Sequence, residues 1–98
     1  MKIILSPIAS NYTTKISIDG LILTIDDIPI DLSVIPEGGY AEPDRDSPFV
    51  GNVTREVAMI KYFYESVKAS PNQSPNIEDY TFEITEGEVP CPIVWRNN

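Results

Sequence analysis

One stretch of the chain constrains its fold more than any other. Residues 15–32 read KISIDGLILTIDDIPIDL, with apolar residues at alternate positions and two acidic dipeptides between them. Asp19-Gly20 is a dipeptide that two-residue type I′ hairpin loops favour, because both central residues of such a loop need a positive φ. A second two-residue loop at Asp26-Asp27 divides the rest of the stretch, so the pattern predicts three short antiparallel strands.

This arrangement specifies cross-strand partners and faces. The expected pairs are Ile18 with Leu21 and Ile16 with Leu23 across the first loop, and Ile25 with Ile28 and Leu23 with Ile30 across the second. Because successive side chains of a strand point to opposite faces, one register places most aliphatic residues on a single face. That face holds Ile16, Ile18, Leu21, Leu23, Ile25, Ile28, Ile30 and Leu32, and Ile22 is the apolar exception on the other face. We therefore predict a three-stranded meander over residues 15–32.

Residues 80–95, YTFEITEGEVPCPIVW, repeat this alternation around the dipeptide Glu86-Gly87. They predict a C-terminal hairpin. Pro90 and Pro92 lack the backbone donor that a central strand needs, so the last strand is expected at an edge of a sheet. Proline there also discourages pairing with a second molecule.

Residues 56–66 leave two structures open, because their apolar residues fit both a strand and a short helix. The run of Ile60, Tyr62, Phe63 and Tyr64 favours a strand, whereas residues 56–59 favour a helix. With either outcome, the 98 residues suit one domain. We predict an all-β domain of seven to eight mostly antiparallel strands, arranged as a small sandwich or a partly open barrel.

Composition excludes several classes of function. Fifteen acidic and seven basic residues give a net charge of -8, which disfavours nucleic acid as a direct partner. Histidine is absent, and with it the commonest general base and transition-metal ligand. The one cysteine, Cys91, allows neither an intrachain disulfide nor a cysteine cluster for zinc. No segment approaches the roughly 20 apolar residues of a membrane span. We expect a cytoplasmic, non-enzymatic protein without a cofactor.

The aspartates of the meander raise the question of a calcium site, since calcium binds six or more oxygen ligands. The predicted register places Asp19 and the Asp26-Asp27 pair at opposite ends of one strand, about 17 Å apart. Asp31 belongs to the same acidic set. We interpret these aspartates as turn and surface residues, because aspartate is one of the residues that tight turns favour. We therefore expect no metal site.

Two groups are candidates for binding a protein partner. The loop EPDRDSP contains Glu42, Asp44, Arg45 and Asp46, which form either a recognition loop or a local set of surface ion pairs. Tyr62 and Tyr64 form either an exposed aromatic patch or part of the core.

Three blocks of the sequence can be read together: IDGLILTIDDIPIDLSVIPEGG, FVGNVTR and ITEGEVPCPI. In this order they resemble a group of small uncharacterised proteins of tailed bacteriophages and prophages that are encoded near tail genes. In that group a DG…LTING…DLS.LPEG block precedes an FVG.V.R block and a closing strand with a glycine turn. Here Asp26-Asp27 stands where that group prefers Asn-Gly, and Glu56-Val57 occupies a turn region without glycine.

The resemblance implies a phage origin and a role in the virion or its assembly, and it brings no catalytic residues. We therefore expect an accessory protein that acts through protein contacts in the bacterial host cytoplasm or in the virion. The alternative, prompted by the net charge of -8, is an acidic protein that imitates DNA to inhibit a host protein.

Overall fold

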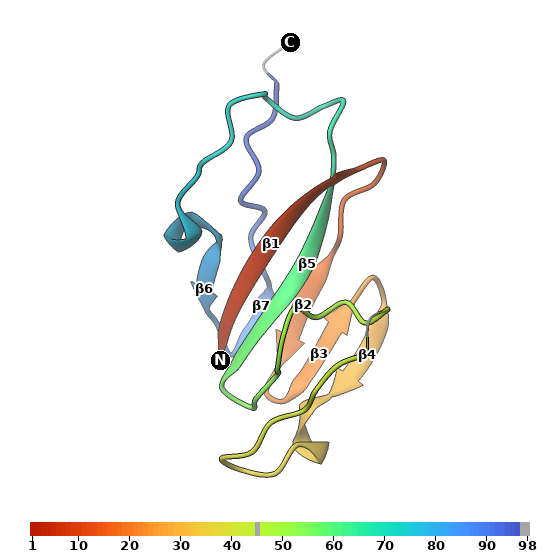
Figure 1. Ribbon diagram of the computed structural model, residues 1–98, viewed down its shortest axis with the longest axis vertical. Coiled ribbons are helices and arrows are strands. Elements are labelled where there is room, and N and C mark those ends of the chain that lie inside the picture. The colour runs from red at the N-terminus through yellow and green to blue at the C-terminus, as the bar shows by residue number, and fades with distance from the viewer. Residues whose placement is uncertain (45, 97–98) are drawn as a thin grey trace.

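The computed structural model describes residues 1–44 and 46–96, and within them the chain forms seven strands and two short 3₁₀ helices. The elements are β1 (Lys2–Ser10), β2 (Ile16–Asp19), β3 (Ile22–Ile25), β4 (Ile28–Asp31), η1 (Leu32–Val34), β5 (Val57–Glu65), η2 (Ile77–Tyr80), β6 (Thr81–Glu83) and β7 (Glu86–Glu88). Strands β5-β1-β6 form one sheet and β4-β3-β2-β7 form the other (Figure 1). Both sheets contribute to one buried cluster, so the predicted small all-β fold is confirmed.

The meander is present, and its second loop has the predicted shape. Ile25 pairs with Ile28 and Leu23 pairs with Ile30. Asp26 and Asp27 have φ angles of 50° and 67°, as a type I′ loop requires at both central positions. The two aspartates therefore form the tight turn without a glycine.

The first loop differs from the prediction by one residue. The central residues are Gly20 and Leu21, so Ile18 pairs with Leu23 rather than with Leu21. Gly20 has a φ of 61°, which matches the glycine at the first position of a type II′ loop. Ile16 correspondingly pairs with Ile25 instead of Leu23. The new register shifts partners by two residues, so the same side chains still face the core.

The predicted faces of the meander are largely confirmed. Leu23 is 0% exposed and its neighbour Ile22 is 40% exposed on the opposite face. The other buried residues of the inner face are Ile16, Ile18, Ile25 and Leu32. Ile28 is the exception, 64% exposed, because it lies beside a hollow between the two sheets.

Residues 57–65 form a strand, so the helical alternative is not what the chain adopts. β5 pairs with β1 in parallel over nine positions, from Lys2 with Val57 to Ser10 with Glu65. This long parallel ladder is an exception to the mostly antiparallel pairing of the two sheets. Its inner face buries Ala58 and Ile60, which pack with the meander in the shared core.

The predicted C-terminal hairpin is wrong. β6 pairs with β1, whereas β7 pairs with β2 of the other sheet, so the two strands are not partners of each other. Glu86 and Gly87 lie inside β7 instead of forming a turn. The physical reason is that β1 and β2 each offer an open edge, and the short segment between β6 and β7 crosses from one sheet to the other. The expected edge strand with Pro90 and Pro92 is also not formed, because β7 ends at Glu88 and residues 89–94 lie outside the strands.

We predict that Leu23→Ala lowers the free energy of unfolding by about 2–5 kcal/mol, because it empties a fully buried site in the shared core. Ile22→Ala is the matched control on the opposite face of β3 and is expected to cost less than about 1 kcal/mol. Urea denaturation followed by circular dichroism measures both values. Equal losses in the two variants would contradict the assigned faces.

Candidate functional site

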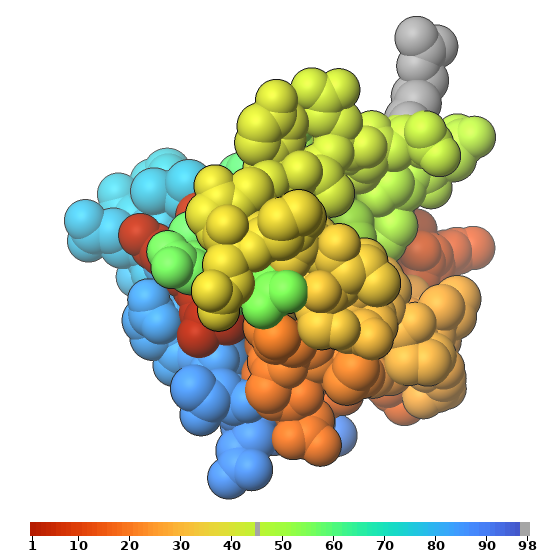
Figure 2. Space-filling model, turned by 90° about the horizontal axis from the view of Figure 1, so that it is seen from below, coloured from red at the N-terminus to blue at the C-terminus, as the bar shows by residue number. Residues whose placement is uncertain are grey.

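The acidic loop comprises residues 42–48, and its last residue, Pro48, lies at the outer edge of β5. Phe49 forms an isolated bridge with Ile60, and the backbone nitrogen of Lys61 donates to the carbonyl of Pro48 at 2.8 Å. Glu42, Asp44 and Asp46 are exposed, which fits both a recognition loop and a local set of surface ion pairs. Arg45 lies outside the described residues. Seen from below, the segment that follows β4, coloured yellow to yellow-green, spreads over this end of the molecule (Figure 2).

An open hollow of about 300 Å³ separates this loop from the β3–β4 turn. We call it the side hollow. Its apolar lining consists of Tyr12, Ile25, Ile28, Ile30, Pro48 and Phe63. Asp26, Asp46 and Lys61 also line it. The hollow therefore combines apolar walls with carboxylates, a composition suited to noncovalent binding.

Two aromatic rings form one wall of the side hollow. Tyr12 stacks on Phe63 with ring centroids 5.5 Å apart and an interplanar angle of 26°. Tyr12 is 44% exposed, so one side of this pair faces solvent. The backbone of the neighbouring Thr14 holds the pair in place, because its nitrogen donates to the carbonyl of Phe63 at 2.8 Å.

Tyr62 and Tyr64, the two tyrosines considered for a partner surface, are not among the residues that line the side hollow. Tyr62 is 3% exposed and belongs to the core, so it does not present its ring to a partner. Burial raises the pKa of its hydroxyl, and a hydrogen bond with Cys91 raises it further. Tyr64 is half-buried and packs against the same core. The side chain of Phe63 lies on the outer face of β5 instead, because neighbouring residues of a strand point to opposite sides.

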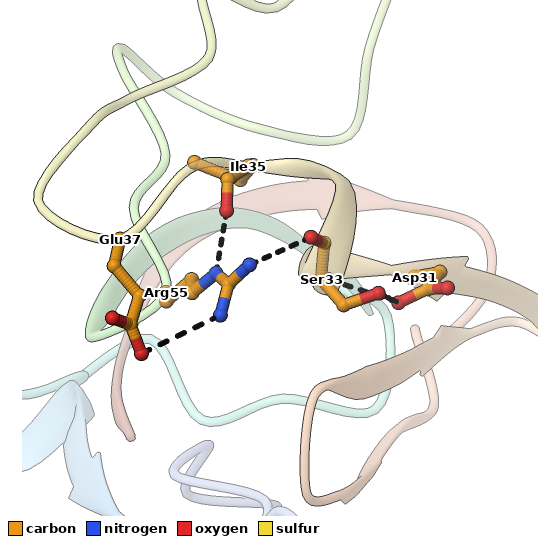
Figure 3. A network of polar contacts seen from close by, with 5 residues as sticks. All are labelled: Asp31, Ser33, Ile35, Glu37 and Arg55. Carbon is orange, nitrogen blue, oxygen red and sulfur yellow. Dashed lines mark hydrogen bonds and ion pairs between the residues drawn. The ribbon is translucent and has the colours of Figure 1, made fainter.

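Arg55 connects the FVGNVTR block to the segment that follows β4. Its Nε donates to the carbonyl of Ile35, and its Nη2 donates to the carbonyl of Ser33 at 2.8 Å (Figure 3). Its Nη1 lies 3.9 Å from Oε1 of Glu37. The arginine of FVGNVTR therefore holds the backbone of DLSVIPEGG, the segment that leads from the meander into the acidic loop.

Asp31 begins this same segment. Its Oδ1 accepts hydrogen bonds from the backbone nitrogen of Ser33 at 2.9 Å and from the Ser33 hydroxyl at 2.6 Å. These bonds cap the N-terminus of η1. The Ser33 hydroxyl bond is the largest cause of a lowered pKa for the Asp31 carboxyl, followed by the backbone bond, and the positive charge of Arg55 adds to it. Arg55 and Asp31 are structural residues in this arrangement.

Of the remaining acidic residues of the meander, Asp26 and Asp27 form the β3–β4 turn, and Asp19 is the last residue of β2. One oxygen of Asp26 accepts a hydrogen bond from the backbone nitrogen of Lys15 at 2.9 Å. Among the described residues, no group of three or more cysteine, aspartate or glutamate side chains comes together in a way that could hold a metal ion. In the same part of the chain, no helix has the length and apolar character needed to cross a bilayer.

Sequence reasoning found the exposed acidic loop but missed the side hollow. The hollow joins residues from the segment between β1 and β2, from the β3–β4 hairpin, from the acidic loop and from β5, which are far apart in the chain. The sequence did contain a local signal for one lining residue, Phe63. If residues 56–66 are read as a strand that buries Tyr62, Phe63 must point the other way.

We predict that Arg55→Met lowers the free energy of unfolding by about 1–3 kcal/mol, because two backbone carbonyls lose a charged donor. Arg55→Lys is expected to restore little, since an ammonium does not reproduce the guanidinium fork. Lys68→Met is the matched control: its exposed ion pair with Glu65 is expected to contribute less than about 1 kcal/mol. Thermal or urea unfolding tests this, and full stability in Arg55→Lys would contradict it.

We predict that the Asp31 carboxyl titrates below its usual pKa of 3.8. A folded-state pKa below the unfolded one means that the capping bonds stabilise the fold above the unfolded pKa and are lost as pH falls through the folded pKa. NMR titration of the side-chain carboxyl carbon measures the midpoint. Ser33→Ala should move it upward, whereas Ser70→Ala, remote from Asp31 in the chain, should not. An unchanged midpoint in Ser33→Ala would contradict the assigned cause.

No protein-family model, curated protein or solved structure matches the chain.

Proposed function

We propose that the chain is a non-enzymatic accessory protein of a tailed phage or prophage, with a structural or assembly role carried out through protein–protein contacts. The observation that carries the contact role is the side hollow, which is apolar, open to solvent and next to the acidic loop. The resemblance of the three sequence blocks supports the phage context. The action belongs in the host cytoplasm or in the virion.

Exposed apolar surface supports contact with another protein. Ile28 and Tyr12 keep much of their apolar area in water, although both lie beside the hollow. Burying a large apolar side chain fully is worth about 1.5–3 kcal/mol. A partner that covers these two side chains gains part of that energy, and the free protein does not.

Prolines at the sheet edges disfavour strand pairing with another protein, which supports contact through side chains instead. The backbone nitrogen of Leu32 donates to the carbonyl of Leu21, so Pro29 occupies an outward-pointing position on the edge strand β4. On β1, the backbone nitrogen of Lys2 and the carbonyl of Ser10 form hydrogen bonds on the β5 side. Backbone groups alternate between the two edges of a strand, so those of the odd-numbered Pro7 point to the opposite edge. Among the described residues, β6 covers that edge from Lys2 to Ile4. Proline has no donor to offer an added strand at either position.

A second candidate is an acidic inhibitor that imitates DNA. The outer face of the four-stranded sheet places Asp19 directly opposite Glu86, with Glu88 two residues further along β7. Asp31 lies in the same row, separated from Asp19 by Ile22. Like charges placed opposite each other destabilise a sheet, which favours a role for them in binding. However, the second row of this face is largely neutral, with Ser17, Thr24 and Pro29, so the charge extends over a short distance.

Fractionation of induced lysogens tests the leading proposal. We expect the full-length chain, tagged at its own locus, to co-fractionate with phage particles or with an assembly intermediate. Ile22→Asp, a charge on the face away from the side hollow, serves as a control and should behave like the unmodified chain. Absence of the chain from virions and from every assembly intermediate would overturn the accessory role.

Salt dependence separates the second candidate from the first. A DNA imitator should lose its host target steeply as salt increases, because the contact depends on many charges. A double variant, Glu86→Gln with Glu88→Gln, should then lose the target as well. Host lysate captured on the chain at rising salt measures both, and retention at high salt would eliminate the DNA-imitating role.

A further inference from the structure

We propose that the side hollow binds one bulky apolar side chain of a partner protein, presented between lysine or arginine residues. This inference rests on the proposed contact function and specifies the partner chemistry and the residues that recognise it. The argument depends on the size of the hollow, its charges and the strand edge beside it.

The size and lining of the hollow fit a side chain. Its volume of about 300 Å³ lies at the lower end of the range for sites that hold small molecules. The walls supplied by Tyr12, Phe63 and Ile28 offer apolar contact on more than one side. Single buried anchors in such sites carry much of the energy of protein interfaces.

The charges at the hollow favour a basic partner segment. Asp26 and Asp46 line it with one lysine, Lys61. The hydrogen bond from Lys15 fixes one oxygen of the Asp26 carboxylate, and a carboxylate accepts several hydrogen bonds at once. Asp27 and Asp44 line other hollows, so the acidic side chains at the side hollow are Asp26 and Asp46. Acidic side chains around an apolar centre attract lysine or arginine that flanks the inserted group.

A second copy of this chain fits the hollow less well. Each copy has a net charge of -8, so two copies bring acidic surfaces together. Strand addition along the neighbouring β4 is also disfavoured, because Pro29 occupies one of its outward-pointing positions and has no backbone donor. Both features favour a side chain from a different protein over a second copy as the occupant of the hollow.

Selection from short random peptides tests the inference, with the immobilised full-length chain as bait and the soluble Ile28→Asp variant as competitor. We expect the selected peptides to contain leucine, phenylalanine or tryptophan next to lysine or arginine. For the synthesised peptides, Ile28→Asp should weaken binding about tenfold or more, as expected from loss of one buried apolar contact.

Matched variants make the result specific. Ile22→Asp places the same charge on an exposed isoleucine of the opposite face and should change the dissociation constant by less than about twofold. Asp46→Asn should weaken binding and reduce its salt dependence, whereas Glu86→Gln, on the outer face of the sheet, should do neither. Circular dichroism spectra and unfolding temperatures of the variants should match those of the unmodified chain.

Three results would overturn the inference. One is a set of selected peptides without enrichment in basic residues. Another is binding that Ile28→Asp leaves unchanged. The third is a dimer in analytical ultracentrifugation that Ile28→Asp dissociates, because the occupant is then a second copy.

The test also separates this inference from the accessory role. If Ile28→Asp co-fractionates with phage particles as well as the unmodified chain does, the hollow is not the docking site, while the accessory role stands. If neither co-fractionates with any particle but the peptides still require Ile28, the accessory role fails and the binding chemistry of the hollow stands.

Discussion

The parallel ladder between β1 and β5 is the interaction on which the rest of the fold depends. Its nine pairs join the beginning of the chain to residues 57–65. Because the strands are parallel, the chain between them must return to the starting end of the sheet, and this long connection contains the entire meander. The inner face of the ladder, with Ile3 and Ile60, then covers the inner face of the meander. The outer edge of β5 binds Pro48 and Thr14, which places the acidic loop and Tyr12 at the side hollow.

Alternation predicted most of the meander residues that face the core, but it did not predict the pairing of strands that are far apart in the chain. In the meander, tight turns force neighbouring strands together, so local residues were sufficient and the error at Gly20 shifted only the partners. Residues 80–95 show the same alternation, yet they do not form a hairpin. Instead, β6 pairs with the edge of β1, and β7 pairs with the edge of β2. Glu86-Gly87 resembles a turn dipeptide, and Gly87 does have a φ of 103°, but it lies within a strand. Pairing with distant strands is not encoded in a local pattern.

The candidate site shows the same division between local and distant information. The exposure of Glu42, Asp44 and Asp46 follows from local composition, because charged residues between prolines favour surface loops. The assignment of Tyr62 to a partner surface required knowing whether residues 56–66 are a strand and which face is covered, and both depend on β1. The hollow itself depends on Tyr12, Ile28 and Phe63 coming together, and none of them signals this alone.

The prolines and the acidic charge both oppose self-association, which in small β proteins occurs through open sheet edges. Pro7 and Pro29 remove outward donors from the edges of β1 and β4. The net charge of -8 adds repulsion between copies over the whole surface. With both forms of self-association opposed, the chain can leave Ile28 and Tyr12 exposed at the side hollow without pairing with itself. If the proposed basic partner is correct, the same acidic charge attracts it, and the features that oppose self-association then also contribute to the choice of partner.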